Sequence, residues 1–289
     1  KNGVRKEYFL TPTFIIEPLF VKGGIVVETW DALQKDVEMY LAKRPGKTAV
    51  SCWLLTEKQG FSIGGKNELP SASLIKLLVL VELCEEVRRG RANLKEAISI
   101  LGPAITGGDG IIKELKIGHT FTLEELATLM IIVSDNEAAN QLIDRLGMKA
   151  INERAKKLGL AQTHLGRLMM ADASGEKERD NWTSADDTVH LLRVICETAK
   201  TGSPLGRWMI SLLARQQQEG GLRRNLPDFV QVAHKCGNLA GVEHDAGIFF
   251  GKRPYLLAVL TTEQPASYVG RETIGMVSLL CARAFGLLG

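Results

Sequence analysis

Hydrophobic and polar positions change their periodicity twice along the chain, which divides it into a strand-rich start, a helical middle and a strand-rich end. After a mixed opening stretch, residues 29–43 have helical spacing, while 49–56 and 61–64 are strand-like and suited to a hairpin. From Pro70 on, the predicted helices are 73–89, 122–132, 137–146, 149–158, 184–200 and one beginning at Ser203. Beyond Gly220 the predicted elements are strands at 230–234, 246–250 and 255–261 and a helix at 268–285.

This order of elements predicts an α+β protein. The simplest assembly is one antiparallel β-sheet, flanked by helices and built from both ends of the chain, with an all-helical domain inserted between them. We expect the sheet domain at 27–66 and 215–289, the helical domain at 67–214, and an N-terminal arm at 1–26. A ligand commonly binds in the cleft between two such parts.

Composition restricts the classes of function. The chain has 289 residues, of which 45% are hydrophobic and 24% charged, as in globular proteins. A net charge of +3 without a local basic stripe predicts no nucleic-acid partner. The longest apolar run, 74–83, carries two charges and is too short to span a membrane. Five cysteines lack metal-binding spacing and are expected to pack as small hydrophobic residues without a structural disulfide.

The first motif with chemical meaning is Ser73-Leu-Ile-Lys76. On a helix, residues three apart share a face at about 5–6 Å, so that a lysine can take up the serine proton and make the hydroxyl a nucleophile. Lys76 enters a very apolar helix, where burying its charge is costly unless it has a use. A second match, Ser174-Gly-Glu-Lys177, lies in a polar stretch and is interpreted as a solvated loop.

Ser134-Asp135-Asn136 lies between two predicted helices. Taken alone, it is interpreted as a helix cap, because all three residue types cap helices well.

Lys235-Cys236-Gly237 follows the first of the C-terminal strands. A lysine there could hold a substrate carboxylate, and a glycine lets a substrate backbone approach the strand edge. Lys200-Thr201-Gly202 has a similar pattern but ends a predicted helix, where the glycine is interpreted as a helix terminator.

In this order and spacing, the three motifs resemble the active-site-serine penicillin-recognising family, which includes class A β-lactamases and DD-peptidases. The resemblance covers roughly 29–289 and leaves out the opening arm. It implies the β-lactamase/transpeptidase-like fold. It also places Lys235, rather than Lys200, in the strand motif of the family.

The resemblance also implies roles for the motif residues. Ser73 would be the acylated nucleophile, and Lys76 would assist its deprotonation. Ser134 would relay a proton to the leaving nitrogen, while Asn136 would hydrogen-bond Lys76 and the substrate amide. Lys235 would support the Ser134 hydroxyl and the substrate carboxylate.

The substrate would lie along Cys236, Gly237 and Asn238. The backbone N–H groups of Ser73 and Asn238 would form an oxyanion hole, which stabilises the charge that develops during acyl transfer. Cys236 replaces the usual threonine or serine, and a thiol is a weaker hydrogen-bond donor. Arg223 and Arg224 are two candidates for the arginine that clamps the substrate in the family.

The loop between Arg167 and Asp180 departs from the family pattern. Arg167 and Asp180 resemble the pair at the base of its Ω-loop, but Met169 stands where class A enzymes carry the glutamate that activates the deacylating water. Asp172 is our preferred replacement because it lies nearest in sequence, with Glu176 and Glu178 as alternatives.

The function expected from these residues is a serine hydrolase that opens β-lactams through an acyl-enzyme, with slow deacylation. One alternative is a DD-peptidase or esterase acting on peptidoglycan-like peptides, and another is a β-lactam-binding sensor that does not turn over. We expect a small-molecule substrate, a monomer, and no metal or cofactor. The resemblance favours a protein exported to the periplasm or the medium, whereas free thiols favour a reducing compartment, so the compartment stays open.

Overall fold

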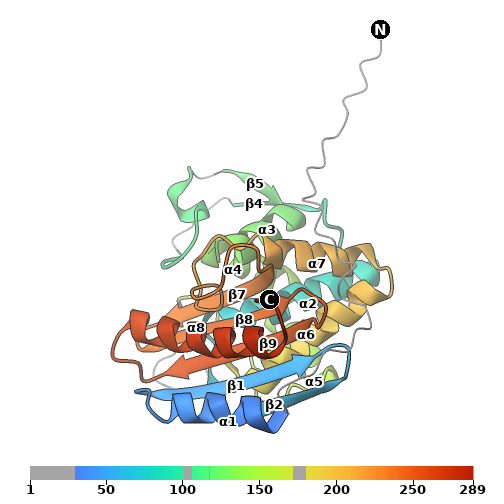
Figure 1. Ribbon diagram of the computed structural model, residues 1–289. Coiled ribbons are helices and arrows are strands. Elements are labelled where there is room, and N and C mark those ends of the chain that lie inside the picture. The colour runs from blue at the N-terminus through green and yellow to red at the C-terminus, as the bar shows by residue number, and fades with distance from the viewer. Residues whose placement is uncertain (1–29, 101–105, 117, 172–179, 289) are drawn as a thin grey trace.

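A computed structural model describes residues 30–100, 106–116, 118–171 and 180–288 (Figure 1). Its main sheet is antiparallel and has the strand order β2-β1-β9-β8-β7. The bounds are Lys47–Leu54 (β1), Gln59–Ile63 (β2), Val232–Leu239 (β7), Val242–Phe249 (β8) and Tyr255–Thr262 (β9). The predicted α+β class is therefore confirmed, while the opening arm lies outside the described residues.

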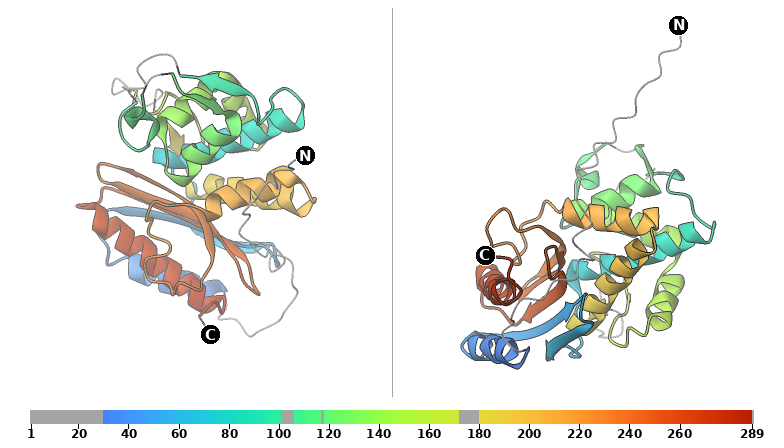
Figure 2. Two further views of the ribbon diagram at one scale, coloured as in Figure 1. Left: turned by 90° about the horizontal axis from the view of Figure 1, so that it is seen from above. Right: turned by 45° about the vertical axis from the view of Figure 1, so that its right-hand side comes forward.

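The sheet joins the two ends of the chain, because β1 pairs along its whole length with β9. Helices α1 (Trp30–Leu41) and α8 (Ser267–Ala284) pack side by side on one face, as Figure 2 shows. The other helices lie on the opposite side: α2 (Ile75–Arg88), α3 (Leu123–Ile132), α4 (Asn136–Leu146), α5 (Met148–Lys157), α6 (Ala185–Lys200) and α7 (Pro204–Ala214). Each apolar face of the sheet is thus covered by helices.

Local signals place the helices of the middle region well. Thr122 forms a full capping box with Glu125 at the start of α3, and the Ser184 hydroxyl accepts from the backbone N–H of Asp187 at the start of α6. Pro204 opens α7.

None of the helices in the described parts is long and apolar enough to cross a membrane.

Two predicted strands were too short, and several small elements were missed. The strands expected at 230–234 and 246–250 are β7 and β8, so the Lys235 motif lies inside a strand rather than at its end. Buried polar residues on both strands hid the apolar pattern there. The missed elements are two small sheets, β3 (Leu69–Pro70) with β6 (Trp182–Thr183) and β4 (Ala97–Ser99) with β5 (Thr120–Thr122), and the short helices η2 (Ala72–Leu74) and η3 (Ile112–Glu114).

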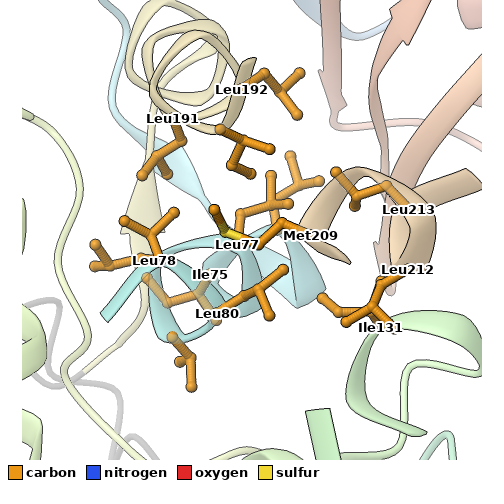
Figure 3. Close-up of a cluster of buried hydrophobic side chains, with 14 of the residues drawn as sticks. Ile75, Leu77, Leu78, Leu80, Ile131, Leu191, Leu192, Met209, Leu212 and Leu213 are labelled. Carbon is orange, nitrogen blue, oxygen red and sulfur yellow. The ribbon is translucent and has the colours of Figure 1, made fainter. Parts of the chain in front are cut away.

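Helix α2 forms the centre of the larger core, as its apolar sequence predicted. Figure 3 shows Leu77, Leu78 and Leu80 among side chains of α6 and α7. A buried ion pair, Arg154 Nε to Glu82 Oε2 at 2.6 Å, joins α5 to the same helix. The helix that follows Ser73 is therefore fixed on all sides.

We expect Leu77→Ala to lower the free energy of unfolding by about 2–5 kcal/mol, because Leu77 is fully buried and the change leaves a cavity. Leu115 is 42% exposed, and Leu115→Ala should stay within about 0.5 kcal/mol of the parent. Denaturant titrations measure both, and equal losses for the two variants would contradict the placement of α2 at the core.

Candidate active site

Ser73 lies in the 3₁₀ turn η2, directly before α2, rather than in the α-helix itself. The Ser71 N–H donates to the Asn181 carbonyl at 2.8 Å, which ties the turn to the segment before β6. On the other side β7 approaches so closely that a Cβ on Gly237 would stand 2.8 Å from the Ser73 nitrogen. Glycine at position 237 therefore lets the strand edge meet the turn that carries the serine.

The turn between α3 and α4 carries Ser134, Asp135 and Asn136. The helix-cap interpretation holds for Asp135, whose side chain accepts from the Ala138 N–H at 2.9 Å. Ser134 and Asn136 instead both contact the side chain of Lys76. One short turn thus combines a structural residue with two that contact the lysine.

A buried cluster joins the three motifs. Lys76 Nζ donates to the Ser134 carbonyl at 2.6 Å, the Ser134 hydroxyl at 3.0 Å and Asn136 Oδ1 at 2.7 Å. Lys235 Nζ donates to the same Ser134 hydroxyl at 3.0 Å and to the Cys236 carbonyl at 2.7 Å. Both lysines are fully buried. Segments far apart in sequence therefore place two amines on one hydroxyl beside the Ser73 turn.

Burial changes the proton affinity of both amines. Desolvation lowers the pKa of Lys76 well below 10.5, and the Lys235 ammonium lowers it further, against the opposing charges of Asp109 and Asp135. Desolvation also lowers the pKa of Lys235. A neutral amine at Lys76 has a lone pair that can accept a proton, which an ordinary surface lysine lacks at neutral pH.

Three residues around the lysine cluster and the neighbouring cleft have a strained backbone. Ala72, Ser134 and Met170 have φ angles of 45°, 56° and 61°, a left-handed conformation that L-residues rarely adopt. Such conformations cost about 1–3 kcal/mol each and concentrate at functional sites. Ala72 and Met170 line the cleft described next, and Ser134 lies in the cluster behind it.

A cleft of about 330 Å³ opens over Ser73. Asn136 lines it from α4, Met169 from the loop after α5, and Asn238 from the end of β7. Ser73 and Asn238 therefore border the same space, as an oxyanion hole made from their N–H groups requires. Ser73 is 9% exposed and is reached from this cleft.

The base of the loop after α5 is closed as expected, since Arg167 Nε donates to Asp180 Oδ1 at 2.8 Å. Asn140 holds Met169 from both sides: its Oδ1 accepts the Met169 N–H at 2.7 Å, and its Nδ2 donates to the Met169 carbonyl at 3.2 Å. Asp172, Glu176 and Glu178 lie outside the described residues, as does the second serine–lysine match. An apolar side chain, that of Met169, therefore lines the cleft at the position where the resemblance implies a glutamate.

Cys236 and its neighbours form the wall beyond Lys235. The Cys236 thiol donates to Gln218 Oε1 at 3.5 Å, and burial raises the pKa of the thiol despite the nearby Lys235. His234 Nδ1 lies 2.9 Å from Asp245 Oδ1 in a buried pair. Cys236 is thus a protonated, hydrogen-bonded side chain rather than a reactive thiolate.

Arg223 and Arg224 do not line the Ser73 cleft. They border a different pocket of about 470 Å³, together with Gln216 and His234. Lys200 ends α6, and Gly202 follows it with φ 79°, so the similar motif there is a helix terminus. Within the described residues no group of three histidine, cysteine, aspartate or glutamate side chains could hold a metal ion.

Sequence reasoning missed Asp109, which lines the cleft. The signal was the run Gly107-Gly108-Asp109-Gly110, where a charged residue lies among glycines between predicted elements. Such glycines allow close backbone approach, and Asp109 accepts the Asn136 N–H through its carbonyl at 3.0 Å.

The fold and the cluster together define a serine hydrolase of the β-lactamase type. The family model described as "Beta-lactamase enzyme family" matches residues 32–285. This chain therefore belongs to the beta-lactamase enzyme family. A beta-lactamase of Streptomyces albus G is 31% identical over 211 residues, which cover 68% of this chain and 67% of that protein.

Solved structures agree over most of the chain. A beta-lactamase from Sphaerobacter thermophilus superposes with a TM-score of 0.82 and 26% identity, covering 91% of this chain and 98% of the other. A protein called PBP-A gives 0.80 and 27%, covering 89% and 96%. A mutant of PBP-A, solved as an acyl-enzyme complex with penicillin G, gives 0.80 and 27%, covering 89% and 97%.

Proposed function

We propose that Ser73 is the nucleophile with which this chain opens β-lactam rings, and that the described cluster moves the protons of the reaction. The observation that carries the proposal is the shared contact of Lys76 and Lys235 with the Ser134 hydroxyl. All the groups of the cluster come from one chain, so the active unit that we propose is a monomer. We further propose that this monomer has two domains, a sheet domain formed by 27–66 and 215–289 and a helical domain formed by 67–214.

In acylation, Ser73 Oγ attacks the carbonyl carbon of the ring, and Lys76 as a neutral amine accepts the hydroxyl proton. The carbonyl oxygen takes up negative charge, which the N–H groups of Ser73 and Asn238 stabilise at the cleft wall. The C–N bond of the ring then breaks, leaving an ester on Ser73.

The ring nitrogen needs a proton as this bond breaks, and Ser134 is the donor that we propose. With Lys76 protonated by the first step, the Ser134 hydroxyl can pass its proton to the nitrogen and receive one from Lys76, 3.0 Å away. Lys235 holds the Ser134 oxygen from the other side at 3.0 Å and contributes positive charge for a substrate carboxylate. Asn136 keeps Lys76 in place, with Oδ1 2.7 Å from Nζ.

Deacylation is the slower half of the proposed reaction. Water must attack the ester and lose a proton, yet a thioether at Met169 cannot accept one. The absence of a proton acceptor at position 169 also favours two other functions. One is a DD-peptidase or esterase acting on peptidoglycan-like peptides, and the other is a sensor that keeps its acyl group. The relay at Ser134 argues against a sensor, because a protein that only binds does not need to protonate the leaving nitrogen.

The test is to incubate the protein with benzylpenicillin or nitrocefin and follow both product and protein mass. We expect a ring-opened ester on Ser73 that adds the whole mass of the β-lactam, found by peptide mapping, with slow turnover of nitrocefin. Ser73→Ala should form no adduct, whereas the control Ser99→Ala, which changes an exposed serine, should react like the parent. An adduct that survives in Ser73→Ala would contradict the proposal, and one stoichiometric burst without turnover would favour the peptidase or sensor.

A further inference from the structure

One carboxylate in the cleft has no assigned use. Within the described residues, the acidic side chains that line the cleft are Asp109 and Asp180. Asp180 is paired with Arg167 at 2.8 Å and also accepts the Asn181 N–H at 2.7 Å. The carboxylate of Asp109 makes no hydrogen bond or ion pair with any described residue, although it contributes negative charge to the surroundings of Lys76 and Lys235.

The backbone at Asp109 is fixed by the same turn that carries Ser134. Asn136 makes two hydrogen bonds to this loop. Its backbone N–H donates to the Asp109 carbonyl at 3.0 Å, and its Nδ2–H donates to the Gly107 carbonyl at 2.9 Å. Asp135 Oδ2 accepts the N–H groups of Ile111 and Ile112 at 2.6 and 2.9 Å. The distance of Asp109 from the reacting groups is therefore set by the active-site turn itself.

Gly110 explains how the loop comes so near. Its φ is 128°, and a Cβ there would stand 2.5 Å from the carboxyl carbon of Asp135. Only glycine fits both the conformation and the space. The close approach holds Asp109 at the edge of the cleft.

Apolar side chains make up a further part of the cleft lining. Met170 is 52% exposed and Leu239 is 39% exposed, and both line the cleft with Met169 and Ala240. The buried amines of Lys76 and Lys235 already donate hydrogen bonds to Ser134, Asn136 and the Cys236 carbonyl. A substrate side chain near these residues therefore meets apolar surfaces and, in Asp109, a carboxylate without an ion-pair partner among the described residues. The Arg167 guanidinium, which also lines the cleft, is already paired with Asp180.

We propose that Asp109 is a specificity-determining residue, which favours β-lactams whose acyl side chain joins an apolar group to a cationic amine. The inference rests on the proposed acylation of Ser73. The amine would form an ion pair with Asp109 while the apolar part packs on Met170 and Leu239. An anionic side chain at the same place would be repelled and would lose its hydration without compensation.

Three penicillins with the same nucleus test this: ampicillin carries an ammonium on the side chain, benzylpenicillin no charge, and carbenicillin a carboxylate. The second-order rate of Ser73 acylation is measured for each. Asp109→Asn should lower the rate ratio of ampicillin to carbenicillin by about three- to tenfold, the range of a partly exposed ion pair. Benzylpenicillin should change little, and added salt should weaken the preference of the parent.

Glu114→Gln is the matched control, because it removes a negative charge from the same segment but not from the cleft. It should leave the ratio unchanged. The inference is overturned if Asp109→Asn leaves the ratio unchanged, or if all three acylation rates fall together, as a structural role would require. It is also overturned if the variant only prolongs the three adducts, which would make Asp109 a deacylation base. Failure of benzylpenicillin to acylate the parent would instead overturn the proposed function, and this inference with it.

Discussion

Replacing Met169 with glutamate is expected to shorten the lifetime of the Ser73 acyl-enzyme by about 10²–10⁴-fold, the usual contribution of a positioned general base. Met169 lines the cleft with Ser73, and Asn140 fixes the backbone on both sides of the residue. A carboxylate on this backbone would face the ester from a defined position and could take the proton of an attacking water. Mass spectrometry after removal of free benzylpenicillin measures the lifetime.

Met169→Gln is the control for this change. Glutamine has the length and polarity of glutamate but accepts no proton at neutral pH, so the lifetime should stay close to that of the parent. Thermal unfolding of both variants checks that the buried position tolerates a polar side chain, since Met169 is 8% exposed. An adduct equally long-lived in the glutamate variant would show that the side chain at position 169 does not reach the ester.

The core and the order of layers could be predicted because local signals and hydrophobic periodicity agree there. The capping box at Thr122 and the proline at the start of α7 mark helix starts that the structure retains. The continuous apolar sequence of α2 predicted a central helix, and its residues are the centre of the main core. In such segments, burial and local propensity favour the same structure.

Prediction failed where tertiary contacts replace periodicity. β7 carries His234 and Lys235 in its middle, and neither residue type indicates a buried strand. Both polar side chains are tolerated there because His234 lies in hydrogen-bond contact with Asp245 and Lys235 donates to the Ser134 hydroxyl. The two-residue strands at Leu69 and Trp182 are too short for any pattern and exist only because distant segments meet.

The site was predicted only in part for a similar reason. Ser73, Lys76, Ser134, Asn136 and Lys235 belong to ordered motifs, and the structure brings them together. Their catalytic roles stay predictions. Asp109 belongs to no motif, and its position in the cleft follows from glycines and from Asn136, which only the folded chain brings together. The sequence likewise indicated no partner for Met169, whereas the structure shows Asn140.

Replacing Lys76 with alanine is expected to slow Ser73 acylation by about 10²–10⁴-fold, because the neutral amine is the proposed proton acceptor. In the parent, the rate should rise with pH as Lys76 loses its proton and then level off. Burial and the Lys235 ammonium lower the pKa of Lys76, so this rise should be centred well below 10.5. Stopped-flow acylation with nitrocefin across the neutral and alkaline range measures the profile.

The direction in which Lys235 shifts the pKa of Lys76 provides a second test of this mechanism. Lys235→Gln removes a positive charge that lowers the pKa of Lys76, so the centre of the rise should move to higher pH, whatever the rate itself becomes. Lys200→Gln changes the lysine of the similar motif at the end of α6, away from the cluster, and should leave the profile in place. A profile that moves to lower pH in Lys235→Gln would contradict the mechanism, since Lys76 would then not be the group whose deprotonation limits acylation.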